Sequence, residues 1–382
     1  MRYTGILLGA MMMIFTGCVV NIGTGPLPYA LTTVGRAERG LTIRVILQRG
    51  DDTTTRIAAA NLTADPASAV SISAVGDVQL LETGVVNFSG QTSDGTIATT
   101  SITIAAPPQI LFDGLAAGNR DIYSVRLDGS SLTRLTTNGA DDVHPSSAAG
   151  DILFSSFRDG NAELYAVALA GGAERRLTTS SSNETQPALA PDGRHAVYMA
   201  NVSGVNRVWI ATVNLAASTL TSAQALSPPG FISVGSEATP AWSPGSDRVV
   251  FVATATPSGG AGLFTVVATA GSTPTLVAGS GSQIVEVEPA WSPDGFRIAY
   301  GATIGTATEI FVRDLRTSIV TQVTHNTGAS GQPAWLADGR IVFTTFAGGT
   351  STLRWVDPDA PTVLHGIATP ALAAEHAAPV RP

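Results

Sequence analysis

Short runs of alternating apolar and polar residues occupy residues 29–105, and no apolar stripe of helical period persists there. Such alternation predicts strands with one buried face. Between residues 29 and 105 the runs, for example residues 41–47 (LTIRVIL), are separated by turn signals such as Asp65-Pro66 and Asp94-Gly95. Strands about eight to twelve residues apart are typical of a small β-sandwich. We therefore expect a sandwich over residues 29–105.

Residues 106–382 contain an internal repeat that is centred on a Pro. The element occurs at His144-Pro145, Gln186-Pro187, Thr239-Pro240, Glu288-Pro289 and Gln332-Pro333. Each copy is followed by a turn, an apolar strand, a second turn and another strand, and several units close on a sequence such as Arg176-Leu177-Thr178. Four strands in about 45 residues correspond to one blade of a β-propeller.

The two ends of the repeat region predict how the propeller closes. The chain enters at residues 109–112 (QILF) as if already at the second strand of a blade, so the inner strand of that blade is missing. Residues 367–372 (IATPAL) offer a sixth copy of the Pro-centred element with no blade after it. We expect this segment to supply the missing strand, which gives six blades and removes the exposed strand edges of an open ring.

Two motifs resemble known families. Residues 289–295 (PAWSPDG) and 157–165 (FRDGNAELY) resemble the WD40-like repeat of TolB-type β-propellers. Residues 75–78, 84–86 and 97–104 resemble a bacterial Ig-like domain of group 2. The resemblance implies an all-β fold, with an Ig-like sandwich at 29–105 and a six-bladed propeller at 106–382. It does not imply one function, because the propeller family includes envelope scaffolds, peptidase gating domains and some pectate-type lyases.

The first eighteen residues predict an export signal. Met1-Arg2 is followed by an apolar run over residues 6–15, which is too short to span a bilayer but suits a signal peptide at residues 1–17. Cys18, the single Cys of the chain, follows at the expected cleavage point, which resembles the lipobox of bacterial lipoproteins. The resemblance implies lipidation of Cys18, a tether at residues 18–28, and an outer-membrane anchor facing the periplasm. The alternative is a secreted protein in which Cys18 is incidental.

Composition excludes several classes of function. All 21 basic residues are Arg, so the chain has no P-loop Lys, Schiff-base Lys or Ser-Lys dyad. One Cys forbids an internal disulfide and any CxxC pair, and the formal net charge of -8 argues against a nucleic-acid partner. We expect a protein partner, a cation or a neutral ligand instead.

The sequence also lacks the usual motifs of catalysis, including GxSxG, HExxH and GxGxxG. The five His residues form no metal-like pair, and of these only His144 is expected on an inner strand. We therefore expect no enzymatic activity and no cofactor, apart from a possible divalent cation in the channel. Trp242, Trp291 and Trp335 occupy one repeat position that also holds Leu189, which favours packing between blades over a sugar-stacking platform.

Two sets of polar positions on the inner strands are candidate site residues. Three residues before each Pro, four blades carry an acid: Asp142, Glu184, Glu237 and Glu286. The residue just before each Pro is polar: His144, Gln186, Thr239, Glu288, Gln332 and Thr369. Residues two apart on a strand face the same way. Both sets are therefore candidates for a channel-mouth site that binds a cation or a basic peptide, the alternative being that the carboxylates cap loops of adjacent blades.

These expectations describe a lipid-anchored protein of the cell envelope whose propeller binds a protein or another ligand. Two alternatives remain from the sequence. One is a lyase or hydrolase that acts on polysaccharide in the channel, and the other is a TolB-like component of an envelope-spanning transport machine.

Overall fold

The computed structural model describes residues 29–49, 54–91, 95, 97–116, 118–228, 230–231, 239–254, 261–279, 286–304, 307–325 and 328–381. Cys18, the signal and tether segments and Glu237 lie outside these residues, as does the side chain of Glu286. Within the described ranges the fold is all-β, with two single-turn 3-10 helices as the only helical elements. None of these helices is long and apolar enough to cross a membrane.

The chain divides into two compact units, residues 1–107 and 108–382. The division falls two residues after the expected boundary between residues 105 and 106. We call them the N-terminal unit and the propeller unit.

The N-terminal unit consists of two antiparallel sheets. One has the order β1-β2-β6-β5, with β3 paired to β2, and the other has the order β4-β7-β8. Its strands are β1 (Tyr29–Val34), β2 (Thr42–Arg49), β3 (Thr54–Arg56), β4 (Leu62–Asp65), β5 (Val70–Ile72), β6 (Asp77–Leu80), β7 (Gly84–Gln91) and β8 (Ile97–Ile104). Alternate residues such as Val45, Val78 and Phe88 point into one shared core. The predicted sandwich architecture is present, and its assignment to the Ig-like family stays a prediction.

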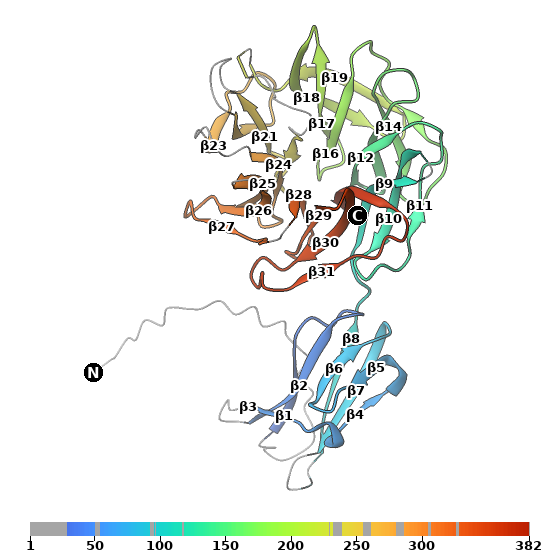
Figure 1. Ribbon diagram of the computed structural model, residues 1–382, viewed down its shortest axis with the longest axis vertical. Helices are drawn as coiled ribbons and strands as arrows, with labels where there is room; N and C mark the ends of the chain where they lie inside the picture. The colour runs from blue at the N-terminus through green and yellow to red at the C-terminus, as the bar shows by residue number, and fades with distance from the viewer. Residues whose placement is uncertain are drawn as a thin grey trace, which may run out of the picture. The chain divides into compact units, whose positions relative to one another are not determined.

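The described residues of the propeller unit form six four-stranded antiparallel sheets, which Figure 1 shows arranged around a central axis. We number these blades in chain order. From the innermost strand outward, blade 1 is β32 (Ala373–Pro379), β9 (Gln109–Ala116), β10 (Asn119–Arg126) and β11 (Thr133–Arg134); blade 2 is β12 (Asp142–Ala148), β13 (Asp151–Ser156), β14 (Glu163–Ala168) and β15 (Arg175–Arg176); blade 3 is β16 (Glu184–Leu189), β17 (His195–Val202), β18 (Val205–Asn214) and β19 (Thr219–Ala225).

The remaining three blades repeat the same order. Blade 4 is β20 (Ala241–Trp242), β21 (Arg248–Thr254), β22 (Ala261–Val267) and β23 (Thr275–Gly279); blade 5 is β24 (Glu286–Trp291), β25 (Arg297–Ile304), β26 (Ala307–Asp314) and β27 (Val320–Gln322); blade 6 is β28 (Ala329–Trp335), β29 (Ile341–Ala347), β30 (Thr350–Val356) and β31 (Leu364–Gly366).

The second strand of each blade is buried on both faces because neighbouring blades stack on it. Phe112, Phe154, Phe251 and Phe343 occupy one position on these strands and are fully buried. This explains why the strands read as continuous apolar runs rather than as alternating ones. The three repeat Trp residues are also buried, in hydrophobic clusters between blades. The Trp positions therefore serve packing, as the sequence predicted.

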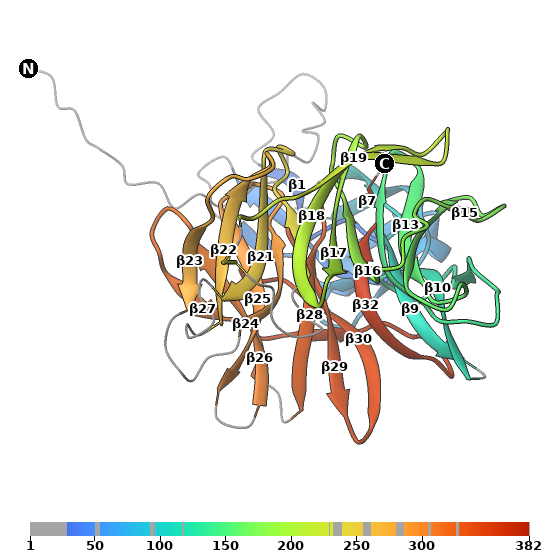
Figure 2. The ribbon, with the colours of Figure 1, turned by 90° about the horizontal axis from the view of Figure 1, so that it is seen from above.

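The C-terminal segment supplies the inner strand of blade 1, although not with the expected residues. β32 pairs with β9, and Figure 2 shows the two strands side by side. The predicted strand, residues 367–372, instead leads into a turn in which Leu372 N–H donates to the carbonyl of Thr369. The prediction was wrong because it searched for a Pro, whereas β32 carries Ala377 at the equivalent position.

Candidate functional site

The six innermost strands surround a channel that contains a cavity of about 140 Å³. The residues just before the repeat Pro, or before the equivalent Ala377 in blade 1, line this cavity, and we call them the polar ring: His144, Gln186, Thr239, Glu288, Gln332 and His376. The next positions on the strands are Pro and small residues, which let the six strands approach one another. The channel wall is thus a polar ring followed by an apolar ring.

Polar-ring residues adopt an unusual backbone conformation. In the described inner strands the φ angle is 55° at His144, 52° at Gln186 and Glu288, 56° at Gln332 and 50° at His376. At the same points the pairing with the second strand shifts register, which marks a β-bulge in each of these five blades. A non-Gly residue in this left-handed backbone conformation costs about 1–3 kcal/mol, and the conformation persists only where the surrounding structure fixes it. The bulges re-aim these side chains relative to a regular strand.

Hydrogen bonds between neighbouring blades fix this conformation. The backbone N–H of Gln332 donates to Glu288 Oε2 at 2.6 Å, and the N–H of His376 donates to Gln332 Oε1 at 2.9 Å. The N–H of His144 donates to Asp113 Oδ1, on β9, at 3.2 Å. Each of these polar side chains therefore satisfies a buried backbone donor of the next inner strand.

The ring closure brings two His residues together in the channel. The rings of His144 and His376 lie with their centroids 4.1 Å apart, and His376 Nδ1 lies 2.7 Å from Oδ1 of the fully buried Asp113. Burial acts to lower the pKa of His376, but the Asp113 carboxylate outweighs it and raises this pKa to about 8. Burial and the charge of His376 lower the pKa of His144 to about 3. Near neutral pH the pair therefore consists of one charged and one neutral imidazole.

An ionic network supports this pair from behind. Arg120 bridges two carboxylates, with one nitrogen 2.7 Å from Asp113 Oδ2 and another 2.5 Å from Glu375 Oε1. His144 Nδ1 is buried and has no hydrogen-bond partner among the described residues. His144 thus retains an unused polar atom in the channel, as do Thr239, Trp291 and Trp335.

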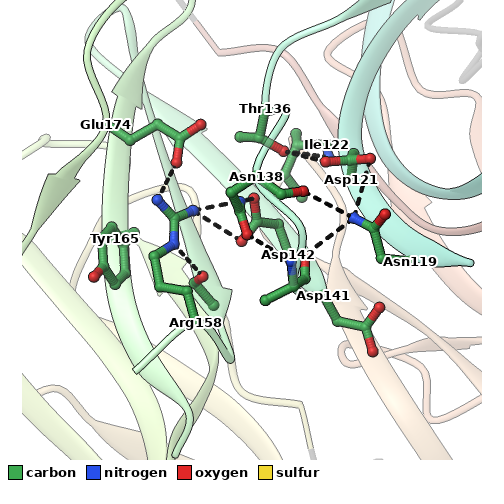
Figure 3. A network of polar contacts seen from close by, with 12 residues as sticks. Asn119, Asp121, Ile122, Thr136, Asn138, Asp141, Asp142, Arg158, Tyr165 and Glu174 are labelled. Atoms are coloured by element: carbon green, nitrogen blue, oxygen red, sulfur yellow. Dashed lines mark hydrogen bonds and ion pairs between the residues drawn. The ribbon is translucent and has the colours of Figure 1, made fainter. Parts of the chain in front are cut away.

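The acidic set lies elsewhere. Asp142 and Glu184 do not line the channel cavity. Asp142 accepts hydrogen bonds from Arg158 at 3.0 Å and from Asn138, as Figure 3 shows, and Glu184 accepts one from Ser180. These two carboxylates therefore bind groups of their own blades and of the loops before them, and neither lines the cavity that the polar ring surrounds.

Sequence reasoning missed three residues of this region: Asp113, His376 and Arg381. Gln332 lies 44 residues after Glu288 and His376 lies 44 residues after Gln332. The equal spacing of these last two intervals, rather than the Pro itself, was the signal that identifies His376. The expectation that only His144 lies on an inner strand was consequently wrong.

Arg381 marks the other end of the cavity. It lines the channel cavity and also a second cavity of about 200 Å³, whose walls include Trp242, Trp291 and Trp335. Burial lowers the pKa of the Arg381 guanidinium, and no carboxylate of the described residues pairs with it. This end of the channel therefore presents a cation beside apolar walls. Across the described ranges, no three His, Cys, Asp or Glu side chains are arranged to hold a metal ion.

Comparison with known proteins shows what the propeller unit is similar to. Residues 107–283 match the family model described as TolB beta propeller domain. Among solved structures, the chain is similar to TolB from Acinetobacter baumannii, with a TM-score of 0.61, 13% identity and coverage of 82% of either chain. A protein assigned as TolB from Agrobacterium tumefaciens gives a TM-score of 0.52 at 13% identity, over 69% of this chain and 89% of that chain.

A third similar structure is hydrazine synthase from Kuenenia stuttgartiensis, with a TM-score of 0.57 and 11% identity over 72% of this chain and 47% of that chain. No curated protein matches the sequence. At these identities the similar structures show a shared fold and not a shared activity.

Proposed function

We propose, from the premise that the propeller unit is a TolB-type β-propeller, that the protein is a binding scaffold of the bacterial cell envelope. In this proposal Cys18 carries the lipid anchor and the propeller channel binds a segment of a partner protein. The signal-like residues before Cys18 support the location.

The channel is the observation that carries the binding role. Its cavity of about 140 Å³ is smaller than the ~300–1,000 Å³ typical of small-molecule pockets. Such a space suits one or two side chains of a partner segment. Its walls offer the unpartnered Nδ1 of His144 at the polar ring and the Arg381 guanidinium at the far end. Arg and Trp are also the residues most enriched at binding hot spots.

Crosslinking in the native host, followed by mass spectrometry, tests the binding role. We expect one envelope protein to be crosslinked by the native chain and lost with Arg381→Ala. Arg316→Ala serves as the control, because Arg316 is exposed and pairs with Asp314 outside the channel. Equal crosslinking by both variants would remove the channel from the proposal.

The membrane anchor has its own test. Replacing Cys18 by Ser removes the acylation site, so the protein should leave the membrane fraction, since stable anchoring requires the lipid chains. Unchanged partitioning of Cys18→Ser would show that lipid at Cys18 does not hold the protein.

A lyase that acts on polysaccharide in the channel is the second candidate, and the His144–His376 pair favours it. The charged imidazole of His376, whose pKa is raised to about 8, can act as a general acid beside the neutral His144. Incubation of the protein with acidic polysaccharides, monitored for new unsaturated ends, tests this candidate. Product formation that is lost with His144→Gln would support it over the scaffold.

A further inference from the structure

Blade 2 contains a cluster built around one arginine. The Arg158 guanidinium donates to Asp142 at 3.0 and 3.2 Å and to Ser156 Oγ at 2.7 Å, and it pairs with Glu174. The same guanidinium lies over the ring of Tyr165, 4.2 Å from its centroid. Figure 3 shows Asp142, Arg158, Tyr165 and Glu174 around this point. We call Asp142, Ser156, Arg158, Tyr165 and Glu174 the blade-2 arginine cluster.

Strand register identifies the equivalent positions in blade 3. Asp142 pairs with Ser156 in blade 2, and Glu184 pairs with Ala200 in blade 3. Likewise, Phe154 pairs with Tyr165, and Tyr198 pairs with Trp209. Six residues separate the paired ends of each hairpin, Ser156 from Glu163 and Ala200 from Arg207. The two hairpins can therefore be compared residue by residue.

Blade 3 keeps the carboxylate and the aromatic ring of the cluster and loses the rest. Glu184 stands for Asp142 and Trp209 for Tyr165, whereas Ala200, Val202 and Ala223 stand for Ser156, Arg158 and Glu174. A cavity of about 380 Å³ opens here, lined by Glu184, Val202, Trp209 and Ala223 among others. We call it the blade-3 pocket. Its position is the one that the arginine fills in blade 2.

The polar atoms that line this pocket are not all used. Glu184 is 5% exposed, and its Oε2 is buried without a hydrogen-bond partner in the described structure. The indole Nε1 of Trp209 is also buried and unpartnered. A buried acceptor without a donor destabilises the folded protein, so a ligand that supplies the donor removes this penalty when it binds.

Charge in the pocket favours a cationic ligand. Arg176 already pairs with Glu163, at 2.9 Å, on the neighbouring β14. Glu184 has no arginine partner of this kind in the described structure. Burial, followed by the repulsion of the Glu163 carboxylate, raises the pKa of Glu184 to about 7. A bound cation would favour the ionised form of Glu184 and replace the missing charge.

We propose that the blade-3 pocket binds a guanidinium group, which pairs with Glu184 and stacks on Trp209 as Arg158 pairs with Asp142 and stacks on Tyr165. The occupant is an arginine side chain of a partner protein, because a planar guanidinium suits both the carboxylate and the aromatic face. This site is separate from the channel, and it does not depend on the function proposed for the channel.

Calorimetric titration of the full chain tests the proposal. The probe is N-acetyl-L-arginine amide, and N-acetyl-L-citrulline amide, which has nearly the same shape without the charge, is the control. We expect the arginine probe to bind and the citrulline probe to bind at least about tenfold more weakly, as loss of one charge-assisted hydrogen bond predicts. Agmatine, titrated separately, distinguishes a free guanidinium compound from an arginine side chain as the source: binding of agmatine without binding of the arginine amide would overturn the assignment to an arginine side chain.

Variants locate the binding. Val202→Arg places a guanidinium in the pocket from within and should abolish binding, as should Glu184→Gln. Ala347→Arg is the matched control, because residue 347 occupies the same repeat position in blade 6, where Ser330 stands for the acid. Val202 is exposed, so its replacement tests the pocket even if Glu184→Gln folds poorly. Failure of the arginine probe to bind, equal binding of both probes, or native binding by Val202→Arg would overturn the proposal.

Discussion

Blades 2 and 3 have the same strand register in their inner hairpins. They differ at one side-chain position, which holds Arg158 in blade 2 and Val202 in blade 3. In blade 2 the Arg158 side chain neutralises the fully buried Asp142 carboxylate. In blade 3 Val202 occupies that position, and the Glu184 carboxylate has a raised pKa next to an open pocket. Both blades thus carry a carboxylate at the same position. In blade 2 the counter-charge is Arg158, whereas the described residues of blade 3 supply none.

This difference separates a structural role from a binding role within one repeat. A buried carboxylate that is paired internally rigidifies its blade and offers nothing to a ligand. The same carboxylate without its arginine is a weaker structural element and a candidate binding group. Three variants test whether the two blades differ in this way, and they are given in order of expected effect.

Removal of the internal arginine should have the largest effect. Arg158→Met leaves the Asp142 carboxylate buried without its cation, and we expect the free energy of unfolding to fall by about 3–5 kcal/mol. Val202→Met at the equivalent exposed position should change it by less than about 0.5 kcal/mol. Urea unfolding of the two variants measures both values. Similar losses would show that Arg158 is not the stabilising partner of Asp142.

The pH dependence of stability should come next. Glu184 has a pKa of about 7 in the folded protein against 4.5 ordinarily. Below pH 4.5 the Glu184 carboxyl is protonated in both the folded and the unfolded state, and its favourable contribution to the free energy of unfolding is fully present. As the pH rises from 4.5 to 7, only the unfolded chain releases the proton, so the free energy of unfolding falls until the folded state also ionises.

Glu184→Gln isolates this contribution, because the other titrating groups, such as His376, are unchanged. We expect its unfolding free energy to fall less between pH 5 and pH 8 than that of the native chain. Denaturant titrations at several pH values measure the two slopes. Identical slopes would contradict a raised pKa at Glu184.

An arginine added to blade 3 should have the smallest effect. Val202→Arg supplies the counter-charge that blade 2 already has, and we expect a gain of about 1 kcal/mol above pH 7, because residue 202 is exposed and an exposed ion pair contributes no more than that. The gain should be smaller at lower pH, because Glu184 is then protonated and has no charge for the added arginine to pair with. Melting curves at pH 8 and pH 5 compare this variant with Ala347→Arg, for which no gain is expected. An equal gain in both variants would trace the effect to net charge.

Local patterns in the sequence were sufficient to predict the blade architecture. The strand periodicity, the Pro-Asp-Gly turns and the Trp positions each depend on neighbours close in the chain or on burial alone, and each has the predicted role. The repeat also located His144, Gln186, Glu288 and Gln332, which line the channel cavity. The acidic set was harder, because the strand pattern does not reveal that Arg158 and Asn138 lie beside Asp142.

Tertiary structure decided which residues meet where the ring closes. Asp113 and His376 are 263 residues apart, and only the pairing of β32 with β9 brings them within 2.7 Å. Likewise, the blade-3 pocket exists beside Glu184 because Val202 and Ala223 have short side chains, whereas the equivalent Arg158 and Glu174 of blade 2 have long ones. The sequence alone determined the repeating unit, since strands and turns are encoded by short-range patterns. The channel pair depends on contacts between segments at the two ends of the propeller unit. The blade-3 pocket lies within residues 177–223 and depends on how the strands of one blade pack.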